Sequence, residues 1–232
     1  MQGGFCRVSF FAIPITDEWG TTYQLTTAGY TALVLVMLAI LLLACFIGGS
    51  LKKPHFSTRQ LVFSAMAIAA GTVTSMIKVF DMPMGGSVTL LSMLFICLIG
   101  YWYGLGAGLM TAISYGFLQL IIDPYIMSIP QMLTDYIFAF GALGLSGIFS
   151  KSKNGLIKGY AIGVLGRYFF AFLSGMIFFG TYAADYGMSA PVYSLVYNGL
   201  YLGAEALITI VILMLPPMKK VMGQLKTLAV QN

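Results

Sequence analysis

The sequence predicts an all-α integral membrane protein, and three observations lead to that prediction. Hydrophobic residues make up 59% of the 232 residues and charged residues only 8%, whereas soluble domains average about 25% charged residues. The mean hydropathy is +0.91. Apolar runs recur along the chain, which has room for about seven membrane helices of ~20 residues each.

The first membrane helix is expected within residues 24–50, after a mixed N-terminal segment. Residues 1–23 lack the basic start and the cleavage site of a secretory signal, so we expect them to form an external segment. Residues 51–59 carry Lys52 and Lys53 after the apolar run. They therefore form a cytoplasmic linker.

Six further spans are expected within residues 60–217. They lie at residues 60–77, 88–100, 104–122, 129–149, 159–180 and 191–215. Pro130 and Pro191 stand at first-turn positions, where proline is favourable because no helical hydrogen bond is lost. Residues 218–232 form a cytoplasmic tail.

Basic residues set the expected orientation. Nine of the twelve Lys and Arg residues fall into three clusters, each in a hydrophilic break or near the C-terminus. The positive-inside rule places these clusters in the cytoplasm, with the N-terminus outside a plasma membrane that the tight loops suggest is prokaryotic. No nucleic acid is needed to explain them. The acidic residues then gather outside, where they would concentrate a cation, although the positive-inside pattern alone gives the same asymmetry.

The helix at 129–149 carries one carboxylate, Asp135, near its start. A charged Asp inside a bilayer costs at least ~2.5–3.5 kcal/mol on insertion scales, so such a residue usually faces a cavity, a partner or a ligand. Asp135 is either a counter-ion for a cationic ligand or an interfacial residue close to the helix end. Its position alone leaves both readings open.

The last span carries a polar stripe of Tyr193, Tyr197, Asn198, Tyr201 and Glu205. Tyr197, Tyr201 and Glu205 follow one another at intervals of four residues and so share one helix face. The stripe can supply hydroxyl, amide and carboxylate groups to one pocket. Alternatively, the tyrosines lie at the membrane interface and the Asn bridges two helices.

Small residues mark two close-packing edges. Ala65 and Ala69 form a small-xxx-small pair, which lets another helix approach closely. Gly100, Gly104 and Gly108 repeat the same spacing and predict a second such edge.

No motif for catalysis or metal binding is found. The sequence has no P-loop, H-E-x-x-H or G-x-S-x-G motif. The three cysteines have no metal-like spacing, and there is one histidine. We therefore expect no catalytic residues, no metal and no cofactor. The residues alone leave a transporter, a solute-binding subunit and an intramembrane enzyme open.

Five motifs together resemble the thiamine-specific S component of energy-coupling factor (ECF) transporters, the ThiT family. They are GGSVTL (85–90), the turn at 101–108, and the segments at 130–149, 167–183 and 191–201. The resemblance spans roughly residues 60–215. It implies a six-helix S-component core with one extra N-terminal transmembrane helix.

The resemblance also implies a function. Such a subunit binds the vitamin thiamine from outside and associates with a transmembrane coupling subunit and two cytoplasmic ATPases, so that it is not itself an enzyme. The absence of a P-loop agrees with this division of labour. Ala65 and Ala69 resemble the family's A-x-x-x-A surface for the coupling subunit.

The family's ligand site carries over onto five positions. Asp135 and Tyr136 resemble its acidic–tyrosine pair, with Asp in place of Glu. Tyr193 and Asn198 resemble its Tyr and Asn in the last span, and Phe179 stands in place of a pocket Trp.

A sixth site residue is Glu205, which we add from its position in the last span. Asp135 would balance the thiazolium cation of thiamine, Asn198 and Tyr193 would pair with its aminopyrimidine, and aromatic rings would stack on it. Ala171 stands where some members have His, which leaves a related pyrimidine or vitamin ligand open. A stand-alone proton-coupled carrier and an intramembrane enzyme are the further alternatives.

Overall fold

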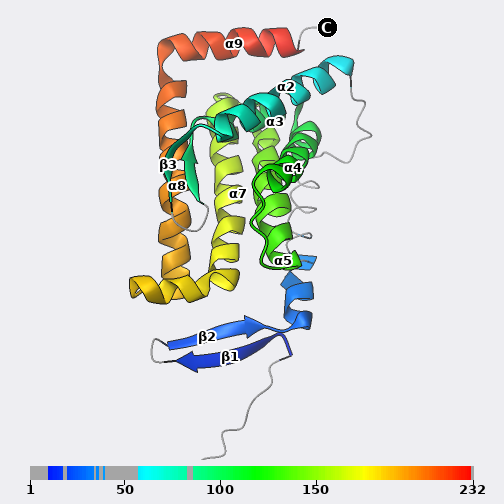
Figure 1. Cartoon of the computed structure of the whole chain (residues 1–232). Coiled ribbons are helices and arrows are strands. Elements are labelled where there is room, and N and C mark those ends of the chain that lie inside the picture. The colour runs from blue at the N-terminus through cyan, green and yellow to red at the C-terminus, as the bar shows by residue number, and fades with distance from the viewer. Residues whose placement is uncertain are drawn as a thin grey trace, which may run out of the picture.

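Helices make up most of the described residues in the computed structural model, and these residues also form two short β-hairpins (Figure 1). The structure describes residues 10–17, 20–33, 35–36, 39, 57–82 and 86–230. The helices are α2 Thr58–Ser75, α3 Ser92–Tyr103, α4 Leu105–Ile122, α5 Ile129–Met132, η2 Leu133–Phe138, α6 Ala139–Gly141, η3 Ala142–Phe149, α7 Gly155–Phe178, η4 Gly180–Tyr186, α8 Ala190–Met214 and α9 Pro216–Val230. The strands are β1 Ala12–Asp17, β2 Gly20–Leu25, β3 Lys78–Asp81 and β4 Ser87–Thr89.

Four helical stretches within the described residues are long and apolar enough to cross a membrane: α4, the continuous run Ile129–Phe149, α7 and α8. The predicted class, an all-α membrane protein, is confirmed. The run at 129–149 has the predicted bounds, but its interior is unusual. It passes from α5 through the π-helix η2 and the short α6 into the 3-10 helix η3.

The third predicted span was wrong at its start. Residues 88–100 were expected to be one helix, but β4 and a turn occupy residues 87–91, and α3 begins only at Ser92. The cause lies in the hairpin: β4 pairs antiparallel with β3, from Lys78 opposite Thr89 to Asp81 opposite Ser87. Leu91 then takes a left-handed conformation, φ 61°, which breaks the chain direction before the helix.

Other boundaries differ by a few residues. α7 begins at Gly155 rather than 159, and the expected loop at 181–190 contains the 3-10 helix η4. The N-terminal segment forms the antiparallel hairpin β1–β2, and the C-terminal tail is the helix α9. Most of the predicted first span, 24–50, lies outside the described residues. Its described part is helical at 27–33 and packs Leu33 against α4, α6 and α7 residues.

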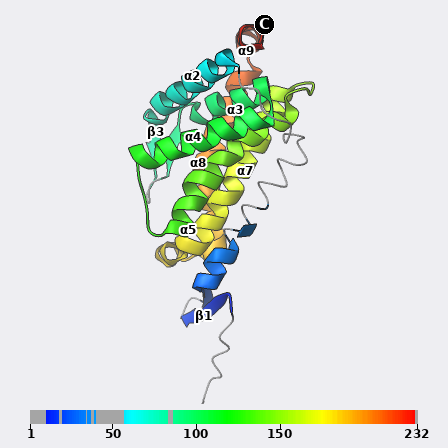
Figure 2. The ribbon, with the colours of Figure 1, turned by 90° about the vertical axis from the view of Figure 1, so that its right-hand side faces the viewer.

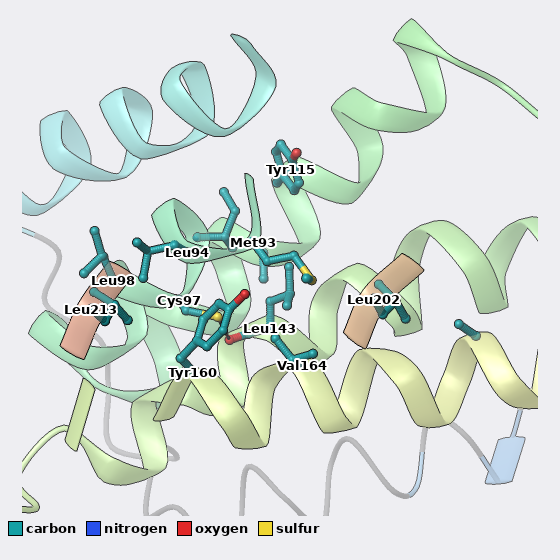
Figure 3. Close-up of a cluster of buried hydrophobic side chains, with 13 residues drawn as sticks. Met93, Leu94, Cys97, Leu98, Tyr115, Leu143, Tyr160, Val164, Leu202 and Leu213 are labelled. Atoms are coloured by element: carbon teal, nitrogen blue, oxygen red, sulfur yellow. Dashed lines mark hydrogen bonds between the residues drawn. The ribbon is translucent and has the colours of Figure 1, made fainter. Parts of the chain in front are cut away.

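The core of the bundle surrounds α3, whose residues Ser92–Gly100 are nearly all buried. Figure 3 shows Met93, Cys97 and Leu98 of α3 beside Tyr160 and Val164 of α7. The hairpin β1–β2 lies at one end of the bundle and α9 crosses the opposite end (Figures 1 and 2). The helices therefore form a single packed body with two distinct end faces.

Glycines bring α3, α4 and η3 into backbone contact. A Cβ at Gly108 would lie 2.7 Å from Gly100 Cα and 2.7 Å from Gly144 O. The close-packing edge predicted for Gly100 and Gly108 therefore exists. The backbone of Gly104 also takes part in this contact, because a Cβ at Gly147 would lie 2.5 Å from Gly104 C. Gly104 itself takes φ +90° at the break between α3 and α4, and a Cβ on it would meet nothing within 4 Å.

Candidate functional site

A cavity of about 210 Å³ lies between the β3–β4 hairpin, the helical run at 129–149, α7 and α8. All six predicted substrate-binding residues line it: Asp135, Tyr136, Phe179, Tyr193, Asn198 and Glu205. They come from the run Ile129–Phe149, from the end of α7 and from α8, three successive spans. The structure therefore brings the predicted set together around one space.

The charges of the cavity lining favour a cation. Its acidic members are Asp123, Asp135 and Glu205, and its basic members are Lys78 and Arg167. Three carboxylates against two cations give a formal charge of −1 when all are ionised. A ligand that carries one positive charge would bring this sum to zero.

Asp135 is held by a neighbour one turn earlier, Gln131. The Gln131 amide donates to Asp135 Oδ2 at 2.6 Å and to the Tyr125 carbonyl at 3.0 Å. Gln131 Oε1 accepts from the Met127 N–H at 2.9 Å. Gln131 is only 1% exposed, so it ties the carboxylate to the segment of Tyr125 and Met127 at the rim of the cavity.

The π-helix η2 sets the direction of Asp135. The Ala139 N–H bonds to the Thr134 carbonyl, five residues back, and the Thr134 hydroxyl donates to the Pro130 carbonyl at 2.8 Å. A π-turn inserts one residue into the helical repeat and is frequent at functional sites. Here it turns the carboxylate and the next residue, Tyr136, toward the same cavity.

An aromatic wall closes one side. Phe179 stacks on Tyr125 with ring centroids 5.8 Å apart and on Tyr182 at 6.3 Å. The Tyr136 hydroxyl donates to the Asp123 carbonyl and accepts from the Tyr125 N–H, each at 2.8 Å. The Tyr136 hydroxyl therefore binds the backbone of Asp123 and Tyr125 at the rim. The aromatic ring of Tyr136 is the part of the side chain that can contact a ligand.

Tyr193 and Asn198 differ in how many hydrogen bonds their side chains already form. Tyr193 stacks between Tyr186 and Tyr197, with centroids 5.4 and 5.6 Å away, and its buried hydroxyl has no hydrogen-bond partner among the described residues. Asn198 Nδ2 donates to the Ala171 carbonyl at 3.2 Å and the Ser194 carbonyl at 2.9 Å. Asn198 therefore bridges α7 and α8, the alternative role considered above, and also lines the cavity.

Glu205 accepts hydrogen bonds from residues at and just before the start of α3. Thr89 Oγ1 donates to its Oε2 at 2.6 Å, and Ser92 Oγ and the Met93 N–H donate to its Oε1 at 3.0 and 3.1 Å. The first N–H groups of a helix lack intrahelical partners and favour a negative charge. Glu205, 3% exposed, fills that role from α8.

The early position of Arg167 in its span predicts that its side chain reaches toward the cytoplasmic membrane surface or, as a weaker alternative, pairs with Glu205. In the structure Arg167 instead lines the cavity. Its guanidinium stands 4.1 Å from the Phe140 ring centroid. Within the described part of the chain it forms no ion pair with Glu205 or any other residue. The weaker expectation of an Arg167–Glu205 pair was therefore also wrong.

The β3–β4 hairpin closes another side of the cavity. The Gly86 N–H donates to the Tyr197 hydroxyl at 2.9 Å, and Lys78 Nζ lies 3.5 Å from Asp81 and 3.8 Å from Asp123. These contacts attach the hairpin to α8 and to the segment after α4. Both ion pairs are largely solvent-exposed, a class that contributes little to stability.

Sequence reasoning missed Gln131, Arg167 and Ser174 as lining residues. Gln131 was detectable, because it lies four residues before Asp135 and so shares its helix face. Ser174, buried with no hydrogen-bond partner for its hydroxyl among the described residues, had no distinguishing sequence signal. The described residues contain no group of three or more His, Cys, Asp or Glu side chains that could hold a metal ion.

Three comparisons relate this chain to known proteins. Residues 61–224 match the family described as Thiamine transporter protein (Thia_YuaJ). The chain is 36% identical over 168 residues to the thiamine transporter ThiT of Bacillus subtilis (strain 168). This alignment covers 66% of this chain and 85% of that protein. It is 33% identical over 126 residues to ThiT of Lacticaseibacillus paracasei (strain ATCC 334), covering 45% and 62%.

A solved structure of ThiT from Listeria monocytogenes is also similar. It superposes with a TM-score of 0.57 at 27% sequence identity, covering 68% of this chain and 94% of that one. The region matched by the family, 61–224, contains all six predicted site residues.

Proposed function

The chain belongs to the thiamine transporter protein family, and from this premise we propose that it is the substrate-binding membrane subunit of an ATP-driven ECF vitamin importer that binds thiamine from outside. The resemblance read from the sequence motifs is confirmed by these matches. The observation that carries the proposal is the cavity, because its lining has a formal charge of −1 and contains all six expected residues.

Asp135 is the proposed counter-ion. The thiazolium ring of thiamine carries a permanent positive charge. The Asp135 carboxylate accepts a hydrogen bond from Gln131, whereas Glu205 accepts three and the Asp123 side chain is largely exposed beside Lys78. Phe179 and the Tyr136 ring supply aromatic faces on which a cationic ring can stack, a contact worth up to about 2 kcal/mol when desolvated.

Two hydroxyl groups are positioned to recognise the aminopyrimidine. Tyr193 Oη and Ser174 Oγ are both buried, line the cavity and have no partner among the described residues. A buried polar group without a partner costs about 1–3 kcal/mol, so a ligand that pairs with both would recover that cost. Asn198 Oδ1, which accepts one bond from Tyr201 at 3.1 Å, can accept a second.

α2 is the proposed contact with the coupling subunit. Ala65 and Ala69 are both exposed on it, and large apolar side chains flank them: Leu61 is 62% exposed and Met66 61%. Small residues beside exposed apolar ones let a second membrane helix approach closely. Two cytoplasmic ATPases would then supply the energy, and this chain would perform no chemistry itself.

The proposed topology keeps the N-terminus outside a prokaryotic plasma membrane and the C-terminus in the cytoplasm. Residues 60–217 form the substrate-binding domain, preceded by the external segment 1–23, the extra helix 24–50 and the linker 51–59. On this topology the cavity opens on the outer side. The turn at Lys151 and the helix α9 lie on the cytoplasmic side.

Uptake by reconstituted protein separates this function from its alternatives. Proteoliposomes that contain this chain with a coupling subunit and ATPases are expected to accumulate labelled thiamine only when ATP is present. Accumulation by the chain alone, driven by a proton gradient, would instead identify a carrier that uses Asp135 or Glu205 as its proton site. Conversion of the bound ligand to a new product would favour an intramembrane enzyme.

A further inference from the structure

The C-terminal helix α9 turns away from the membrane span that precedes it. Leu215 takes an extended conformation, φ −63° and ψ 134°, and Pro216 and Pro217 follow. Proline lacks the N–H that would continue the helical hydrogen bonds of α8. α9 therefore starts anew and runs across the end of the bundle (Figure 1).

One face of α9 is attached to the end of α3. The Tyr103 hydroxyl donates to the Ala229 carbonyl at 2.9 Å, and Lys226 Nζ lies 4.1 Å from the Tyr101 ring centroid. Tyrosine and tryptophan are enriched where membrane spans meet water. Because α9 contacts two tyrosines at the end of a buried apolar helix, we infer that it lies at the depth of the lipid headgroups.

The sides of α9 that do not contact α3 are exposed. One of them is apolar and another carries lysines. Val221 is 41% exposed and Leu228 61%; seven residues apart, they lie on the same side of the helix. Lys219 and Lys220 are exposed on the remaining surface, with no ion pair in the described part of the chain. At ~100° per residue, Lys220 lies about 100° around the helix from Val221.

We propose that α9 is a membrane-surface helix that inserts Val221 and Leu228 at the lipid interface and binds anionic lipid headgroups through Lys219 and Lys220. An interfacial helix typically combines an apolar side with a lysine-bearing polar side. Residues 216–230 contain three lysines and no acidic residue, so the charge of α9 complements an anionic lipid surface. Each lysine near such a surface adds to the electrostatic attraction.

The test places one fluorescent reporter on each side of α9 in the full chain. The two native tryptophans, Trp19 and Trp102, are replaced by Phe, and Leu228→Trp is introduced. The protein is reconstituted in nanodiscs that contain equal amounts of phosphatidylglycerol and phosphatidylcholine, with one or the other brominated. We expect bromine to quench this tryptophan, and brominated phosphatidylglycerol to quench it at least about twofold more, because the lysines enrich that lipid locally.

Matched variants assign the effect to the proposed groups. Gly223→Trp places the reporter on the polar side, where a Cβ meets nothing within 4 Å, and it should remain largely unquenched. Changing Lys219 and Lys220 together to Gln should abolish the preference for phosphatidylglycerol. The same change at Lys151 and Lys153, which lie in the turn before α7, should leave it intact.

Three results would overturn the proposal. Quenching at Leu228→Trp no greater than at Gly223→Trp would show that α9 does not enter the interface. Equal quenching by both lipids in the protein with all lysines present would remove the headgroup site. A tryptophan at position 228 that is shielded only after the coupling subunit is added would assign this side of α9 to a protein partner.

Discussion

Glu205 brings a carboxylate into the interior of a membrane span, and its three hydrogen-bond donors explain how the protein holds it there. Its oxygens accept from Thr89, Ser92 and the Met93 N–H, so they are largely occupied before any ligand arrives. We infer that Glu205 acts on the ligand mainly through its charge. Asp135 would make the direct contact.

Glu205→Gln tests this division of roles. The amide replaces an acceptor with a donor that faces Thr89 or Ser92, so we expect the free energy of unfolding to fall by about 1–3 kcal/mol. Thermal unfolding of the purified protein in detergent measures this loss. Thiamine affinity should fall less than it does in Asp135→Asn. A larger loss of affinity in Glu205→Gln would place Glu205 in direct contact with the ligand.

Gln131 is a second residue with a definite expected effect. Gln131→Met keeps the size of the side chain but leaves Asp135, the Tyr125 carbonyl and the Met127 N–H without their partner. We expect a loss of unfolding free energy of about 1–3 kcal/mol, together with faster thiamine dissociation because the rim loosens.

Gln119→Met is the matched control for Gln131. Gln119 is partly buried and donates one hydrogen bond, to Ser75 at 3.1 Å, so its loss should have the smaller effect on stability and on the dissociation rate. Equal effects in the two variants would mean that the contacts of Gln131 have no special importance for the site.

At the level of single residues, the sequence predicted which side chains line the cavity better than it predicted their hydrogen-bond partners and neighbours. Asp135 and Glu205 were identified because a carboxylate in an apolar span needs an explanation. The hydrogen bonds of Glu205 to Thr89 of β4 and to Met93 of α3 join residues 116 and 112 positions apart. No local pattern reports such a pairing. Arg167 was misplaced for the same reason, because its neighbour Phe140 belongs to another span.

Among the elements, η3 and α4 pack so closely that their contact requires glycine at position 144. A Cβ at Gly144 would lie 2.5 Å from Leu109 Cα and 2.5 Å from Leu109 N. Both atoms belong to the backbone, so no side chain can turn aside to make room. The two elements would have to separate.

Gly144→Ala should therefore destabilise the protein by at least about 1–3 kcal/mol, the usual cost of overpacking. The control is Gly203→Ala in α8, where a Cβ would meet nothing within 4 Å; alanine there should be neutral or stabilising by up to ~1 kcal/mol. Thermal unfolding of both variants provides the comparison. Equal stability of the two variants would contradict the glycine-mediated packing.

Element boundaries were predictable where proline or an apolar run fixed them, as at 129–149. They were not predictable at α3, because its start depends on pairing between β3 and β4 and on the carboxylate of a distant helix. The 3-10 and π geometry within 129–149 likewise follows from tertiary packing. The sequence of that span is apolar and rich in small residues. It carries no local pattern that distinguishes α-helix from 3-10 or π-helix.

For the molecule as a whole, the sum of charges in the cavity predicts selectivity. A lining charge of −1 favours a ligand with one positive charge over a neutral one of similar shape. We expect the neutral aminopyrimidine half of thiamine, with a hydroxymethyl group in place of the thiazolium, to bind at least about tenfold more weakly, or ~1.4 kcal/mol. Competition against labelled thiamine measures this ratio. Equal affinities for thiamine and for its pyrimidine half would favour the alternative that the natural ligand is a related pyrimidine.

The most direct test is calorimetric titration of thiamine into the purified chain in detergent, beside Asp135→Asn. We predict tight binding to the unaltered protein and a loss of about 2 kcal/mol or more in the variant, the scale of truncating one partner of a buried charge pair. Asp185→Asn, an exposed residue of η4 outside the cavity lining, should bind as the unaltered protein does. Undiminished binding in Asp135→Asn would remove Asp135 from the site, and no binding to the unaltered chain would contradict the thiamine assignment itself.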